Sequence, residues 1–274
     1  MTQVHPGGTT AAVPLEVSQL ATAQGLGAHR ATFAPNKRWR LIISVGVLVL
    51  IFGLLTLGIG ASSMSSADSP SPAAVWSTVA VVELVLIGLF LWPLLTSPVM
   101  SAKARARQFY VFEYGLVHVG AKGTQAYRFD AVADVIAAVV STTYNGISAG
   151  TNYKYEVRFG DGRVLKLNTF STDMARFGPL LQTEIANAQL PRFWDALGAG
   201  HALGFSPFTI SSSGIATANK PMVPWSQIRG VQVANGRVNV LQVGKRLPWA
   251  GAQTKNIPNL YTFLALAERL AGTA

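Results

Sequence analysis

The sequence predicts a membrane-anchored α+β protein, in which a hairpin of two transmembrane helices precedes two tandem β domains that each end in a helix. Two observations support this fold class. Residues 39–96 contain two apolar runs, and each is long enough for the roughly 20 helical residues that cross a bilayer. From residue 105 onward, alternating apolar and polar residues, tight-turn glycines and amphipathic helical stretches occur twice in the same order.

The composition excludes some classes of protein. Half of the 274 residues are apolar and only 12% are charged, as is typical of a membrane anchor joined to folded domains. Cysteine is absent, which excludes a disulfide framework and thiolate metal sites. The formal net charge is +10, and it is concentrated near the C-terminus, where residues 200–274 contain seven Lys or Arg and a single acidic residue.

The N-terminal part is expected to anchor the chain. Residues 1–38 predict a flexible cytoplasmic tail with one short helical stretch from Pro14 to Gln24. Residues 39–60 and 75–96 predict the two transmembrane helices, joined by the short external loop 61–74. The loop has no Lys or Arg, whereas basic residues flank both runs on their other sides: Lys37, Arg38, Arg40, Lys103, Arg105 and Arg107. The positive-inside rule then places both termini in the cytoplasm and the chain in the plasma (inner) membrane.

Glu83 is a carboxylate close to the middle of the second apolar run. A charge at that depth costs about 2.5–3.5 kcal/mol, so we expect the group to be neutral or paired. One interpretation is a functional proton or ion site. The other, which we favour, is a neutral acid that forms a hydrogen bond with Ser44, Thr56 or a neighbouring subunit.

Residues 105–198 predict the first β domain. Its clearest element is a hairpin in which Tyr153, Tyr155, Val157 and Phe159 alternate with polar residues up to the tight turn at Asp161-Gly162. A helix with one apolar stripe follows from Ser171, and Pro191 is expected to open a further short helix that ends at Gly198.

Residues 199–274 predict a second β domain with the same organisation. Short strands lead to a hairpin whose turn is Asn235-Gly236, and Pro258 opens a closing helix. Phe129, Val132 and Val135 of the first domain align with Trp225, Ile228 and Val231, 96 residues further on. This spacing indicates an internal repeat of the size expected for tandem domains.

The repeat carries a family resemblance. The second domain is similar to an uncharacterised, mostly actinobacterial family of membrane proteins with bacterial pleckstrin-homology-like (PH-like) domains. The similarity lies in the segments GFSPFTISSSGI, VPWSQIRGVQVANGRVNV, PWA and IPNLYTFLALAE. The resemblance covers residues 30–270 and implies two partly open, strongly bent β barrels, each capped by a helix. It is weaker in the first domain, where Phe129 replaces the tryptophan and an insertion from Ser141 to Asn152 is expected to interrupt the strands.

Basic residues from loops and strand ends of the second domain are the candidate binding site. They are Lys220, Arg229, Arg237, Lys245, Arg246 and Lys255. Near an anionic lipid leaflet, each would contribute about 1 kcal/mol to binding, so we expect contact with anionic headgroups. The alternative is evenly distributed charge that keeps the domain in solution.

The expected function is that of a non-enzymatic, membrane-anchored scaffold or regulatory module, which presents its domains to membrane lipids or to a protein partner. The alternative is an accessory or small oligomeric membrane component, assembled as a homo-oligomer through its transmembrane helices. No paired acids, nucleophile or metal-ligand spacing predicts catalytic residues, a cofactor or a metal. Nucleic-acid binding is not expected, because aromatic and basic residues do not interleave.

Overall fold

The computed structural model divides the chain into two units, residues 36–106 and residues 1–35 with 107–274, and each is described by itself. The structure describes residues 13–34, 46–56, 58, 71–96, 108–120, 123–144 and 147–272. The predicted external loop up to residue 70 and the six basic flanking residues lie outside these ranges.

In the described part of the smaller unit, residues 46–56 are helical and α3 (Pro72–Thr96) is a further helix. They meet where the hydroxyl of Thr56 donates a hydrogen bond to the carboxylate of Glu83. Gly53 lies beside this contact, because a Cβ there would be 3.6 Å from Glu83 Oε1. Thr56 is one of the two hydroxyls that the sequence offered as partners for this acid.

The predicted transmembrane hairpin at 39–60 and 75–96 is wrong. Within the described ranges, none of the helices has both the length and the apolar content that a bilayer crossing requires. The prediction relied on the length of the apolar runs alone, although the second run carries the Glu83 carboxylate near its middle. The predictions of a membrane-anchored fold class and of an integral membrane localisation with both termini cytoplasmic depended on this hairpin, so they are wrong as well.

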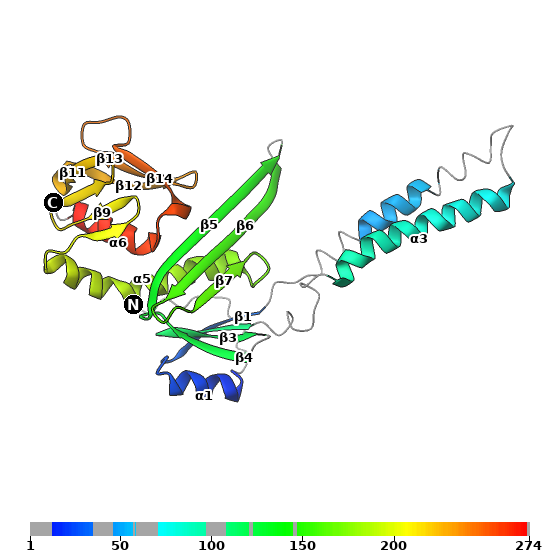
Figure 1. The fold of residues 1–274 in the computed structure, drawn as a ribbon, viewed down its shortest axis with the longest axis horizontal. Coiled ribbons are helices and arrows are strands. Elements are labelled where there is room, and N and C mark those ends of the chain that lie inside the picture. Colours follow the sequence, from blue (N-terminus) through cyan, green and yellow to red (C-terminus); the bar gives the residue numbers. More distant parts are fainter. Residues whose placement is uncertain are drawn as a thin grey trace. The chain divides into compact units, whose positions relative to one another are not determined.

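The first module of the larger unit contains two antiparallel sheets and a helix (Figure 1). The first sheet has the order β1-β2-β3-β4 and the second has the order β5-β6-β7. The elements are β1 (His29–Phe33), β2 (Gln108–Phe112), β3 (Gly115–Gly120), β4 (Gly123–Arg128), β5 (Val132–Tyr144), β6 (Ile147–Phe159), β7 (Val164–Asn168) and α5 (Met174–Gly198).

The N-terminal segment is part of this module, although the sequence predicted a flexible tail over residues 1–38. Helix α1 (Leu15–Ala23) buries Val17 and Ala21 against the first sheet. Strand β1 then pairs antiparallel with β2, so that Phe33 lies opposite Phe109. The chain leaves the sheet for residues 36–106 and returns at β2, because strand pairing does not require neighbours in sequence.

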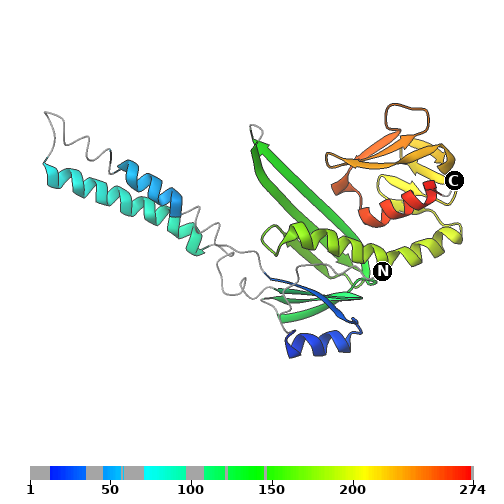
Figure 2. The ribbon, with the colours of Figure 1, turned by 180° about the vertical axis from the view of Figure 1, so that it is seen from behind.

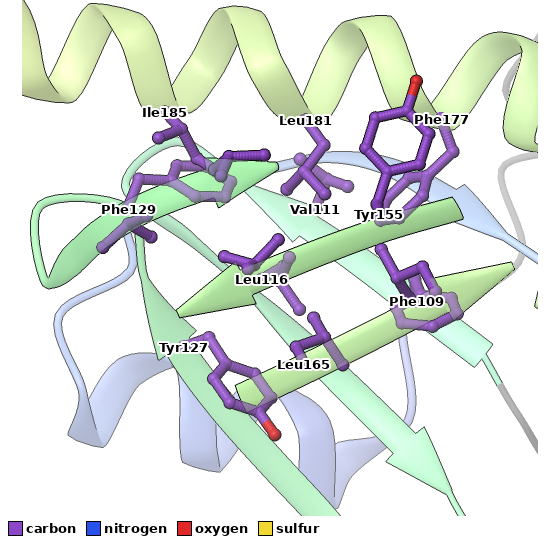
Figure 3. Packing of buried hydrophobic residues seen from close by; sticks show 14 of the residues in the cluster. Phe109, Val111, Leu116, Tyr127, Phe129, Tyr155, Leu165, Phe177, Leu181 and Ile185 are labelled. Carbon is purple, nitrogen blue, oxygen red and sulfur yellow. The ribbon is translucent and has the colours of Figure 1, made fainter. Parts of the chain in front are cut away.

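A hydrophobic core fills the space between the two sheets and α5 (Figure 3). Phe177 of α5 is fully buried and its ring centroid is 5.0 Å from that of Phe109. Tyr155 of β6 lies beneath the same helix, where burial raises the pKa of its hydroxyl to about 12. The helix therefore closes the module through aromatic packing.

Two local predictions for this module need correction. Helix α5 is a single helix of 25 residues that continues through Pro191, so no separate short helix begins there. The insertion from Ser141 to Asn152 does not interrupt β5 and β6 but lengthens their hairpin, with Ser141 paired opposite Thr151. An insertion at the end of a hairpin preserves the ladder when both strands gain residues.

The second module repeats this order of elements. A sheet with the order β11-β10-β9-β8 is followed by a sheet with the order β12-β13-β14 and by a closing helix. The elements are β8 (Leu203–Phe205), β9 (Phe208–Ile210), β10 (Gly214–Thr217), β11 (Lys220–Pro224), η1 (Trp225–Gln227), β12 (Ile228–Ala234), β13 (Arg237–Gln242), β14 (Ala250–Gln253), η2 (Thr254–Asn256) and α6 (Leu260–Gly272).

The aligned residues occupy matching places in the two modules. Phe129 follows β4 and Trp225 follows β11, and both are buried in their cores. Gly115 opens β3 and Gly214 opens β10. A Cβ at either glycine would lie 2.3 Å from a carbonyl oxygen of the paired strand. The internal repeat is therefore present in the backbone as well as in the sequence.

Asn259 joins the two modules. Its backbone N–H donates to Val135 O at 2.9 Å, and its side-chain Oδ1 accepts from Val135 N at 2.9 Å. Its Nδ2 also donates to Ala133 O at 3.1 Å. Residue 259 thus pairs with the outer edge of β5 in the manner of a neighbouring strand.

Candidate functional site

The structure separates the six basic residues of the predicted site into two groups. Lys220 begins β11, Arg229 occupies the irregularity of β12 beside Gln242, and Lys245 and Arg246 lie in the β13–β14 loop. The other two, Arg237 and Lys255, belong to the opposite end of β13. Six residues of an extended strand separate the ends by roughly 17 Å. One continuous cluster is therefore not formed.

The β13–β14 loop is the stronger candidate, and we call residues 243–249 the basic loop. Its two ends are anchored by backbone hydrogen bonds, from Val243 N to Gln227 O at 2.8 Å and from Trp249 N to Val240 O at 2.9 Å. Between these anchors, Lys245 and Arg246 are exposed and Leu247 has 80% of its surface accessible. The loop therefore presents an apolar tip beside two cations.

Lys220 extends this surface from the neighbouring sheet. Its Nζ donates to the carbonyl oxygen of Trp249 and lies 5.7 Å from the centroid of the Trp249 ring. Two further apolar side chains are exposed nearby: Met222 at 49% and Val243 at 56%. Basic and apolar groups are thus mixed on one end of the second module.

The sequence identified the basic residues of this surface but missed its apolar ones. Leu247, Val243 and Met222 follow no helical or strand periodicity that would mark them as exposed. The usable signal is the run Lys245-Arg246-Leu247-Pro248, because a proline after a leucine favours a turn over a buried strand.

A recess of about 340 Å³ in the first module, between the β2–β3 turn and α5, is another candidate site. Its charges are largely matched. Arg30 Nη1 donates to Glu184 Oε1 at 3.0 Å, and Arg128 donates to Asp130 at 2.8 Å. The guanidinium of Arg128 lowers the pKa of the Asp130 carboxyl. Since each arginine already pairs with a carboxylate, the recess offers an anionic ligand little cationic character.

The described residues do not include a cluster of side chains that could bind a metal ion. In the ranges that the structure describes, no three His, Asp or Glu side chains lie close enough to hold an ion. Three of the four histidines are described: His29 in β1, His118 in β3 and His201 after α5. His118 stacks on Phe109 with ring centroids 4.6 Å apart, which makes it part of the packing.

Fold and site together define a tandem α+β protein, built from two antiparallel modules with a basic loop on the second. The chain belongs to DUF6585, a family of unknown function whose model matches residues 2–272. Comparisons with curated proteins and with solved structures give no match.

Proposed function

We propose that the protein is a non-enzymatic binding module, whose basic loop docks on anionic lipid headgroups. We further infer that both modules are PH-like. A four-stranded sheet, a three-stranded sheet and a closing helix follow one another in each, and this order supports that inference. The observation that carries the proposal is the 80% exposure of Leu247 beside Lys245 and Arg246.

The chemistry of the basic loop favours a lipid surface over a protein surface. An exposed leucine gains free energy when it enters the apolar layer beneath the headgroups. The neighbouring cations gain about 1 kcal/mol each from an anionic surface. The exposed apolar side chains of this surface, Leu247, Val243 and Met222, are interspersed with cations. They therefore do not form the continuous apolar patch that marks many protein interfaces.

Neutralising the two cations of the loop tests the proposal. Lys245→Gln with Arg246→Gln removes about 2 kcal/mol of attraction, so we expect roughly 30-fold weaker binding of the full chain to vesicles with anionic lipid. Co-sedimentation at physiological salt measures this change. The fold is expected to persist because both side chains are exposed.

The matched control neutralises two exposed cations near the opposite end of β13, with Arg237→Gln and Lys255→Gln. This variant has the same net charge but an unchanged basic loop, so its binding should stay within about threefold of the original chain. Equal losses in the two variants would mean that net charge, and not the loop, drives binding. The proposal would then be wrong.

A further inference from the structure

The β5–β6 hairpin of the first module extends beyond the rest of its sheet (Figures 1 and 2). Strand β7 pairs only with residues 154–158 of β6. The hairpin continues past this point to Tyr144, which is paired with Ile147. We call residues 139–152 the arm. A two-stranded ribbon is marginally stable alone, so such an arm gains from a further partner.

The hydrogen-bonding direction along β5 follows from its contact with Asn259. Val135 directs both its N–H and its C=O outward to Asn259. Because this direction alternates along a strand, Val139 and Ser141 also direct their backbone groups outward, away from β6. In the described part of the chain, no backbone hydrogen bond links these outward groups to another element. The arm therefore continues the same strand edge that forms hydrogen bonds with Asn259 at Val135.

This edge lacks the features that usually prevent strands from pairing. No charged residue and no proline occurs from Val135 to Tyr153, although Lys and Pro are the common protection of exposed edges. Val139 and Val140 are also exposed, at 44% and 56%. In a chain of net charge +10, the arm is a stretch without charges that would repel a second copy.

We propose that the β5 edge of the arm pairs antiparallel with the same edge of a second copy of this chain. Val139 pairs with Ser141 of the other copy, and the reverse pair completes about four hydrogen bonds. Val140 then lies on the two-fold axis opposite its own equivalent. It forms a pair without hydrogen bonds, in which the Cα atoms are about 4.5 Å apart.

A single cysteine tests this arrangement in the full chain, which contains none of its own. Val140→Cys places two thiols within the Cα separation that a disulfide spans, about 4.4–6.8 Å. Mild oxidation should therefore give a covalent dimer, read as a doubled mass on a non-reducing gel. The matched control is Val164→Cys, an exposed valine on β7 at the other edge of the same sheet.

A second substitution separates pairing from chance collision. Ser141→Pro removes an outward N–H but leaves the β5–β6 ladder intact, since proline lacks only its own donor. Added to Val140→Cys, it should reduce the dimer yield roughly tenfold, because two hydrogen bonds are lost per dimer. Equal yields at residues 140 and 164, or a yield that Ser141→Pro leaves unchanged, would overturn the proposal.

Discussion

Replacement of Gly214 by alanine is expected to lower the free energy of unfolding by about 3 kcal/mol, at the upper end of overpacking costs. The new Cβ would lie 2.3 Å from Val223 O and 2.9 Å from Val223 C. These are backbone atoms of the paired strand β11, so relief requires the sheet to open rather than a side chain to turn. Urea unfolding followed by circular dichroism measures the loss.

Gly204→Ala is the control for this substitution. Gly204 lies in β8 of the same module, and a Cβ there meets nothing within 4 Å. Its replacement should leave stability unchanged or raise it slightly, by about 0.4–1 kcal/mol, because alanine restricts the unfolded chain. Indistinguishable unfolding curves for Gly214→Ala and Gly204→Ala would contradict the close approach of β10 and β11.

Asn259→Gly is expected to weaken the connection between the two modules. Residue 259 has a φ of +50°, which glycine adopts easily, so the substitution removes the side chain without straining the backbone. Val135 N and Ala133 O lose their side-chain partners. The loss of these bonds costs about 2 kcal/mol, and the amide of Val135 should exchange hydrogen roughly 30-fold faster.

Two further variants serve for comparison: Asn259→Ala should have a larger effect, and Asn256→Gly is the control. Alanine also loses the side-chain contacts and in addition strains the backbone at positive φ, so exchange should accelerate further. Asn256 is exposed in η2, and its replacement should leave the exchange of Val135 within about threefold. Unchanged protection of Val135 in Asn259→Gly would show that other contacts hold the modules together.

The second module could be predicted in outline because its signals are local. The Asn235-Gly236 turn joins β12 and β13, as a two-residue hairpin turn should. The closing helix α6 begins at Leu260, two residues after the Pro258 that the sequence predicts to open it, and it buries Phe263 and Ala267. The alignment of Phe129 with Trp225 also has a structural counterpart, since the two residues follow equivalent strands.

The first module was harder to predict because it is discontinuous in sequence. Strand β1 pairs with β2 across an interval of more than 70 residues, and hydrophobic periodicity does not predict a pairing between strands so far apart in the sequence. The short polar stretch around His29 was predicted to be part of a flexible tail, because its partner strand lies so far away in the sequence. The transmembrane prediction failed differently: it relied on runs of apolar residues, whereas the described helices do not meet the requirement for crossing.

The candidate site could be predicted in its charges and not in its geometry. The basic residues are evident in the sequence, but their division between the two ends of β13 depends on the strand register. The exposure of Leu247 depends on where the loop leaves the sheet. Neither the strand register nor the exposure of Leu247 can be predicted from local sequence patterns.

The central claim is that the basic loop itself contacts an anionic lipid surface. An environment-sensitive fluorophore reports this contact when it is attached to Leu247→Cys in the full chain, which has no other cysteine. We expect a blue shift and a rise in emission with vesicles that contain anionic lipid, and no change with neutral vesicles. The same label on Val233→Cys, an exposed valine in β12, should stay unchanged. A chain that co-sediments with anionic vesicles while the label at residue 247 keeps its aqueous emission would contradict the account.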